Sequence, residues 1–308
     1  MLTRLFSHSK PIAFAILSIL FAIAFVVENF ISTTTGFSAS IIFSKLGVLA
    51  VFLLIVFLLN FMVKRNKIHQ HHTFAASSFV LLIIAFPEIL RSTEFVFSYF
   101  FLLLSFRRIL SLKTNTNFKQ KLFDSSFLLS ISIWFEPFHW LFIAVIYFGV
   151  IMYASQNYRH FIIPVVGLAV GFVLRLCYFL IFENKWIGFQ DYLPEFTGID
   201  FFFDSFKYGS LLGLLLLILV WIIFQLPVIF NRAKLHQSES LSIVLFFMLI
   251  SIAVMIFNNS PLAMDAIYLV WPLSILIGNY FQLKSTKKWI KEVFYMIFLA
   301  GIVFSALY

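Results

Sequence analysis

The sequence predicts an all-α fold, a polytopic transmembrane bundle of about eleven helices, on three observations. Hydrophobic residues make up 62% of the 308 residues, and the mean hydropathy is +1.02. Charged residues make up only 11%, less than half of the roughly 25% that is typical of soluble domains. The apolar residues form long continuous runs rather than alternating patterns, which favours helices over strands. This composition excludes a soluble enzyme, a secreted disulfide scaffold and a disordered protein.

The apolar runs define the helices in order along the chain. A membrane helix needs about 20 apolar residues, and only helices and closed barrels satisfy their backbone hydrogen bonds in lipid. The runs predict helices over residues 11–27, 41–63, 74–90, 94–110, 124–136, 138–155, 161–182, 207–230, 241–257, 262–282 and 289–308.

The first run has the outline of a signal peptide, because Arg4 and Lys10 precede it. No small-x-small cleavage site follows, and the chain continues with Glu28 and Asn29. We therefore expect an uncleaved first membrane helix.

The fifth run, 124–136, is too short to span a membrane alone. Pro137 separates it from the sixth run, in the sequence Trp134-Phe-Glu136-Pro137-Phe-His139-Trp140. Two interpretations are open: the two runs extend and cross the membrane twice, or they form a re-entrant pair. Either interpretation leaves the termini on the same sides of the membrane.

The charged residues sort into two sets when the connections between helices are taken alternately. One set has 17 basic and 3 acidic residues, and the other has 5 basic and 10 acidic residues. The positive-inside rule then predicts a cytoplasmic N-terminus and an external C-terminus. The formal net charge of +9 is thus a topological signal and requires no nucleic-acid partner. The basic set is Arg4, Lys10, Lys64, Arg65, Lys67, Arg107, Arg108, Lys113, Lys119, Lys121, Arg159, Arg232, Lys234, Lys284, Lys287, Lys288 and Lys291.

The connections contain no segment with the character of a soluble domain. The longest, residues 183–206, is external, aromatic and acidic, and we expect it to lie as an amphipathic segment on the outer interface. We therefore predict one multi-pass membrane domain over residues 1–308, in the cytoplasmic (inner) membrane and in contact with the lipid bilayer. The internal repeats typical of many transporters are not evident.

Arg175 is the clearest candidate for a functional charge, because it lies well inside the run 161–182. Charged side chains at membrane depth are costly and mark functional sites by default. A guanidinium there either binds a phosphate group or pairs with an external carboxylate such as Glu28, Glu88 or Glu136.

Other external charges are further candidates. Glu28, at the outer end of the first helix, is a candidate general base or an interfacial residue exposed to water. Glu88 and Arg91 lie in an external turn, where they either line a cavity or simply close a hairpin. Lys185 is a further candidate for binding phosphate.

The proline break adds Glu136 and His139 as candidate substrate-binding residues, since broken membrane helices often line cavities. The alternative is an interfacial turn in an aromatic belt. The sequence His69-Gln-His71-His72 lacks the histidine boxes of membrane di-iron enzymes, so we expect neither a metal nor a cofactor. We expect Cys177, the single cysteine, to be a buried small apolar residue, and Gly167-x-x-x-Gly171 permits close helix packing.

Three stretches resemble a family of uncharacterised polytopic membrane proteins from Bacteroidota. They are Leu103-Leu-Ser-Phe-Arg-Arg-Ile-Leu-Ser-Leu112, Lys121-Leu-Phe-Asp-Ser-Ser-Phe127 with Phe135-Glu136-Pro137, and Asn157-Tyr-Arg-His-Phe-Ile-Ile-Pro-Val-Val-Gly167. The resemblance implies a location in the cytoplasmic membrane and assigns no catalytic residue.

Three functions fit these features. The first is an external transferase acting on a polyprenyl-phosphate-linked sugar, in which Glu28 is the base and Arg175, Arg91 or Lys185 binds the phosphate. Its layout is similar to that of the large membrane glycosyltransferases. The second is a transporter of a small or lipid-like substrate, with a path along residues 134–140, Arg175, Pro227 and Pro272. The third is a non-catalytic scaffold subunit of an envelope complex, with protein partners that the sequence does not identify.

Overall fold

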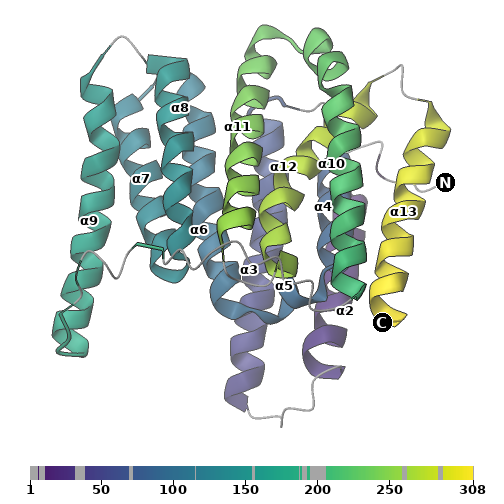
Figure 1. The fold of residues 1–308 in the computed structure, drawn as a ribbon, viewed down its shortest axis with the longest axis horizontal. Helices are drawn as coiled ribbons and strands as arrows, with labels where there is room; N and C mark the ends of the chain where they lie inside the picture. The colour runs from purple at the N-terminus through teal and green to yellow at the C-terminus, as the bar shows by residue number, and fades with distance from the viewer. Residues whose placement is uncertain are drawn as a thin grey trace. The chain divides into compact units, whose positions relative to one another are not determined.

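The computed structural model describes residue 6 and residues 11–31, 39–68, 72–114, 116–154, 157–186, 188, 193–194, 206–258, 262–283 and 287–307. These residues form twelve α-helices and three short helices of other types, and they contain no strand (Figure 1). The all-α prediction is confirmed. Most of the expected external segment 183–206, and His69 and His71, lie outside the described residues.

The chain divides into two compact units. The first comprises residues 1–93, 200–238 and 260–308, and the second comprises residues 94–199 and 239–259. Two compact units can belong to one membrane domain. The single membrane domain over residues 1–308 therefore stays a prediction.

The first unit contains α2 (Pro11–Val26), the π-helix η1 (Val27–Ile31), α3 (Ala39–Arg65), α4 (Phe74–Ile84), α5 (Pro87–Arg91), α10 (Phe206–Arg232), α12 (Leu262–Gln282) and α13 (Lys288–Leu307). Its centre is α12, which packs against α4, α5 and α10. In the most apolar stretch of this helix, 94% of the residues are buried, and the side chains of Trp271 and Tyr268 are completely inaccessible to solvent.

Helices α4 and α12 run antiparallel to each other. Phe74, at the start of α4, lies with its ring centre 5.7 Å from that of Phe281, at the end of α12. His72 Nε2, just before α4, donates a hydrogen bond of 3.0 Å to Gln282 Oε1. The C-terminal end of α4 and the first turn of α12 therefore lie at the same end of this unit.

The second unit contains most of α6 (Thr93–Leu110), the 3-10 helix η2 (Ser111–Thr114), α7 (Phe118–Phe135), the 3-10 helix η3 (Pro137–Phe142), α8 (Ile143–Ala154), α9 (Arg159–Phe182) and most of α11 (Leu235–Phe257). Helices α7, α8 and α9 lie side by side (Figure 1). Phe118 of α7 packs on His160 of α9, and Gly171 of α9 lies against Ser130 of α7. Helices α7 and α9 are therefore parallel and in close contact.

The segment that connects α7 to α9 along the chain, η3 with α8, is antiparallel to both. Trp140 of η3 stacks on Phe172, and Tyr147 of α8 stacks on Phe161, so residue numbers rise along one helix as they fall along the other. The hairpin of α7 with η3 and α8 consequently consists of two antiparallel helical segments that meet at Glu136 and Pro137, and neither is among the helices long and apolar enough to cross a membrane.

Three predicted helices differ from the structure. The run 74–90 is two helices, because the chain turns at Ala85 and Phe86 and Pro87 begins a new helix at its N1 position. The run 124–136 begins six residues earlier, at Phe118, because the polar residues Lys119, Gln120 and Lys121 continue the helix beyond the apolar part. The run 241–257 likewise begins six residues earlier, at Leu235. The run 138–155 is η3 followed by α8, and the other runs lie within a few residues of their predicted bounds.

Seven helical segments of the described chain have the length and hydropathy to cross a membrane. A membrane-embedded protein is the conclusion that these segments support. The count of eleven spans and the orientation of the termini stay predictions. The seven segments are 12–31, 39–65, 93–114, 159–182, 209–232, 237–257 and 264–282.

Candidate functional site

The end of the first membrane helix changes from α-helical to π-helical geometry over Val27–Ile31. A single π-turn shifts the register of the following side chains, and such turns are frequent at functional sites. The turn carries Glu28, whose side chain is 15% exposed, and Asn29, which is buried.

The short helix α5 provides the second part of the site. Pro87 fixes its first turn, and Ile89 and Leu90 anchor it because both side chains are buried. Glu88 lies in its first turn and Arg91 in its last. Helix α5 contacts both η1 and α12.

Glu28 and Arg91 form an ion pair. Arg91 Nη2 lies 2.5 Å from Glu28 Oε1, and the Arg91 side chain is still 48% exposed. The Asn29 amide donates to Leu90 O at 3.0 Å and to Phe25 O at 3.2 Å. Lys45 of α3 donates from Nζ to Arg91 O at 3.1 Å. Asn29 and Lys45 thus hold the carbonyl end of α5 against η1 and α3.

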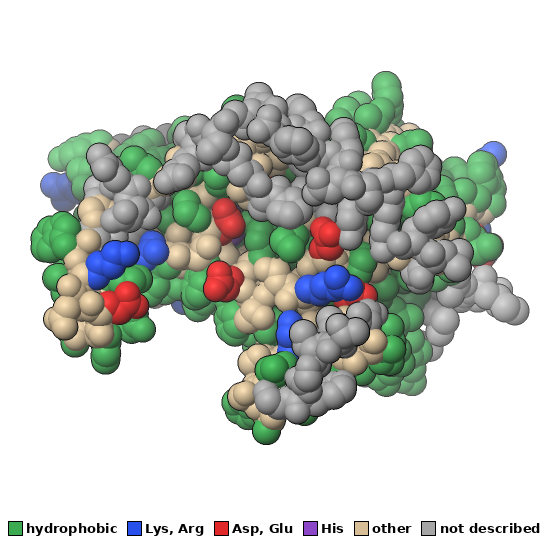
Figure 2. Space-filling model, turned by 60° about the horizontal axis from the view of Figure 1, so that its bottom comes forward, with side chains coloured by type: hydrophobic (Ala, Val, Ile, Leu, Met, Phe, Trp, Pro, Cys, Tyr) green, Lys and Arg blue, Asp and Glu red, His purple; other side chains and the backbone are tan. Residues whose placement is uncertain are grey.

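Two further carboxylates belong to these elements. Glu88 Oε2 is buried and has no hydrogen-bond partner among the described residues. Asp265 is completely buried in the first turn of α12, the helix that contacts α5. Figure 2 shows acidic and basic side chains side by side among hydrophobic ones on one face of the molecule.

This arrangement is chemically suited to an anionic ligand. The Arg91 guanidinium has five N–H donors in a planar fork, and Glu28 engages only one side of it. The Lys45 ammonium lies at the backbone of the same residue. Two cations within one site favour a phosphate group, and the adjacent carboxylate is a potential proton acceptor.

The predicted site residues divide between the two units. Glu28, Glu88 and Arg91 belong to the first unit, and the structure brings Glu28 and Arg91 into direct contact. Glu136, His139, Arg175 and Lys185 belong to the second unit.

His139 is completely buried at the helix break and contacts Ser98 of α6 and Ser132 of α7. Ser98 Oγ donates to Ser132 O at 2.9 Å, and Ser132 Oγ donates to Ser98 O at 2.8 Å. Each hydroxyl has one proton, so neither can donate to His139 Nδ1. The proton is therefore on Nδ1, which donates to the hydroxyl oxygens.

Glu136 lies in the turn after α7, outside the seven candidate spans. Burial raises the pKa of its carboxyl group to about 7, while a hydrogen bond from the Phe138 backbone works in the opposite direction. The carboxyl group therefore changes its protonation near neutral pH.

Arg175 lies in α9 with its guanidinium 5.7 Å from the centre of the Phe179 ring, a distance suited to a cation–π contact. Lys185 is exposed just after α9 ends, and its backbone N–H donates to Phe179 O. Among the described residues, no group of three or more His, Cys, Asp or Glu side chains could hold a metal ion.

Lys45, Asn29 and Asp265 are residues of the site that the sequence did not indicate. Lys45 and Asp265 belong to the second set of charges, which has 5 basic and 10 acidic residues, and their only signal in the sequence is a charge at the edge of an apolar run. No pattern in the sequence indicates that Lys45 contacts the backbone of a residue 46 positions away.

The long apolar helices, with a polar site at their ends, define the class of protein as a helical membrane protein. Within that class, residues 1–307 match DUF6427, a family of unknown function, and the chain belongs to that family. The predicted membership of an uncharacterised family is confirmed, and the Bacteroidota source stays a prediction. Comparisons with curated proteins and with solved structures gave no match.

Proposed function

We propose that this membrane protein is a transferase that acts on a polyprenyl-phosphate-linked sugar in the assembly of envelope glycans or glycoproteins. The observation that carries the proposal is the Glu28–Arg91 ion pair beside Lys45, since it combines a phosphate-binding pair of cations with a carboxylate. In this proposal the site faces the external side of the cytoplasmic membrane.

Binding of the donor would rearrange the ion pair. The donor phosphate competes with Glu28 for the half-exposed guanidinium of Arg91, and Lys45 neutralises part of its remaining charge. Glu28 is thereby released and becomes available to the acceptor. The ion pair thus protects the site in the absence of substrate and opens when the phosphate binds.

The transfer step balances with these residues. The acceptor hydroxyl loses its proton to the Glu28 carboxylate, and its oxygen forms a bond to the anomeric carbon of the sugar. The bond between that carbon and the phosphate oxygen breaks. Polyprenyl phosphate leaves with the electron pair, and Arg91 and Lys45 stabilise the negative charge that develops on it.

Binding and transfer are separable by two variants. We expect Arg91→Gln to weaken binding of undecaprenyl phosphate by roughly tenfold to a hundredfold, because a charge-assisted contact contributes about 1.5–3 kcal/mol. We expect Glu28→Gln to bind this lipid at least as well as wild type and to lose envelope glycan assembly in complemented cells. Binding is measured by native mass spectrometry of the full chain in nanodiscs.

Glu94→Gln is the matched control, since Glu94 is an exposed acidic residue three positions after Arg91. It should leave both binding and glycan assembly unchanged. Equal binding by wild type and Arg91→Gln would overturn the phosphate site. Wild-type glycans in cells with Glu28→Gln would overturn the catalytic role of Glu28 and favour the transporter or the scaffold alternative.

A further inference from the structure

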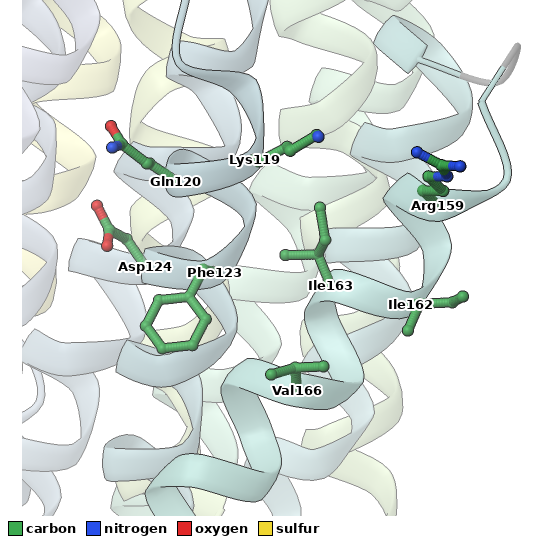
Figure 3. Close-up of a pocket in the computed structure, with 8 residues that line it drawn as sticks. All are labelled: Lys119, Gln120, Phe123, Asp124, Arg159, Ile162, Ile163 and Val166. Atoms are coloured by element: carbon green, nitrogen blue, oxygen red, sulfur yellow. The ribbon is translucent and has the colours of Figure 1, made fainter.

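A second polar region lies in the other unit, in an open groove between α7 and α9. The groove has a volume of about 470 Å³, within the 300–1,000 Å³ that is typical of ligand sites. Lys119, Gln120, Phe123 and Asp124 of α7 line one wall, and Arg159, Ile162, Ile163 and Val166 of α9 line the other. Figure 3 shows these eight side chains.

The groove ends where the two helices touch. Below Val166, an added Cβ at Gly167 would lie 2.8 Å from Phe123 O, so the backbones are in direct contact there. Nearer the helix N-termini the lining residues are larger. The groove is therefore closed toward the middle of the helices and lies along their N-terminal parts.

The charges of the groove are concentrated at its N-terminal end, which is called the groove mouth. In Figure 3, Lys119 extends from α7 toward the side on which Arg159 lies, while Asp124 and Gln120 extend to the opposite side. Asp124 forms an ion pair with Arg108 of α6, in which Nη2 and Oδ2 are 3.1 Å apart. The negative charge of Asp124 is thus compensated, and Lys119 and Arg159 give the groove mouth a net positive charge.

These two cations have no ion pair among the described residues, in contrast to Arg108. The nearby Lys121 turns away from the groove, because its Nζ donates to Ser111 O at 2.8 Å and to Thr114 Oγ1 at 2.5 Å. Both Lys119 and Arg159 are exposed. They are therefore available to a ligand without breaking an ion pair, and the one side-chain contact given for Arg159 is the Tyr158 ring, 6.0 Å from its guanidinium.

The rest of the groove is apolar. Phe123 and Ile163 are half-buried, whereas Ile162 and Val166 are 55% and 49% exposed. Together they form a strip that continues from the charged mouth along about two turns of α9. A single ligand that matches both parts has an anionic head and a hydrocarbon tail.

We propose that the α7–α9 groove is a binding site for one anionic phospholipid of the bilayer, with its phosphate between Lys119 and Arg159 and an acyl chain along Phe123, Ile163 and Val166. Charge complementarity selects the head, and the apolar strip selects a lipid over a free phosphate ion. Basic pockets between transmembrane helices bind anionic lipid headgroups in this way. The site is independent of the transferase proposal, because it lies in the other unit and shares no residue with it.

The proposal is tested with spin-labelled phosphatidylglycerol and phosphatidylcholine in vesicles containing the full-length protein. Electron paramagnetic resonance gives the fraction of each lipid whose motion the protein restricts. Wild type should retain phosphatidylglycerol in preference to phosphatidylcholine. In Lys119→Gln/Arg159→Gln the preference should fall, by roughly fivefold for each charge removed.

The matched control is Lys64→Gln/Arg65→Gln, which removes two exposed charges from the end of α3, on the same predicted side of the membrane. It should keep the preference of wild type. An equal loss in both double variants would overturn the site, since it would show a general attraction of the basic face. No preference in wild type would overturn it as well.

A second pair of variants tests the apolar part and leaves every charge in place. Val166→Trp fills the groove, while Val165→Trp adds the same bulk at a neighbouring exposed valine that does not line it. Only Val166→Trp should lower the preference for phosphatidylglycerol. Displacement of the labelled lipid by millimolar inorganic phosphate, or an equal effect of both tryptophans, would contradict a lipid site.

Discussion

His72 shows how a single residue makes the first unit sensitive to acid. The side chain is buried just before α4, and its Nε2 donates to Gln282 Oε1. Burial lowers its pKa from 6.5 to about 4, with a further decrease from the nearby Lys291 charge and a partial increase from the Gln282 hydrogen bond. His72 is therefore neutral in the folded protein at neutral pH.

The sign of the pH dependence follows from this lowered pKa. Above pH 6.5 the folded and unfolded chains are both neutral at His72, and its contribution to stability is complete. As the pH falls from about 6.5 to 4, the unfolded chain takes up a proton first and the folded state loses up to about 3 kcal/mol.

We expect His72→Gln to reduce this acid sensitivity, because glutamine can donate to Gln282 and does not titrate. The measurement is the Tm of the protein in detergent at pH 7 and at pH 5, for wild type and variant. His160→Gln, in the other unit, is the control and should retain the wild-type difference. An unchanged difference in His72→Gln would show that other groups cause the acid sensitivity.

At the same scale, the candidate site shows what the sequence could and could not predict. Glu28, Glu88 and Arg91 were selected individually because charges at the ends of apolar runs are few. The pairing of Glu28 with Arg91 was not among the predicted pairings, because helices α3 and α4 separate the two residues along the chain. Distances between helices depend on packing, which composition and hydropathy do not encode.

At the scale of the helices, the contact of α7 with α9 depends on small residues in register. Ser126 and Ser130 of α7 face Gly167 and Gly171 of α9. An added Cβ at Gly171 would lie 2.5 Å from Ser130 Cβ, and one at Gly167 would meet the Phe123 backbone. In lipid the hydrophobic effect does not drive helices together, so close packing of this kind is a main source of helix association.

We expect Gly171→Ala to destabilise the protein by about 1–3 kcal/mol, as overpacking does in other tightly packed cores. Adding Ser130→Gly should restore much of this loss, because the facing Cβ and Oγ atoms are removed. Thermal unfolding in detergent measures both variants.

Gly213→Ala is the control, since an added Cβ at Gly213 in α10 meets no atom within 4 Å. It should be neutral or slightly stabilising. Equal destabilisation by Gly171→Ala and Gly213→Ala would mean that helix propensity, rather than the contact with α7, sets the effect.

The helix bounds were predictable where hydropathy changes abruptly at both ends. The run 262–282 agrees with α12 at each end. The prediction failed at 74–90, because the turn at Ala85 and Phe86 interrupts an apolar run without changing its composition. The prediction also missed the beginning of α7. The polar residues there continue the helix beyond its apolar part, so the end of the apolar run does not mark the end of the helix.

At the scale of the whole molecule, the predicted topology depends on the distribution of charge between the two sides. The sequence predicts that Lys64 and Lys288 are cytoplasmic and that Ser40 and Lys185 are external. All four residues are exposed. They are suitable positions for single cysteines. The native Cys177, which is exposed and not buried as the sequence suggested, is first replaced by serine.

In intact cells, an impermeant maleimide should label cysteines at positions 40 and 185 and should leave those at 64 and 288 unlabelled. Permeabilised cells, in which all four should react, control for accessibility. The opposite pattern would invert the orientation and place the Glu28–Arg91 site on the cytoplasmic side. Labelling of all four positions in intact cells would contradict a membrane-spanning arrangement.

The burial of α12 has a consequence for how the protein is made. Among the seven candidate spans it has the lowest hydropathy, 1.2, and it carries Asp265, Ser274 and Asn279 as buried polar residues. A nascent segment of this kind partitions poorly into lipid by itself. Its insertion therefore has to be coupled to docking against α4, which leaves the ribosome much earlier. An error in α4 would thus appear first as a failure of biogenesis, with degradation of the chain before any function is measured.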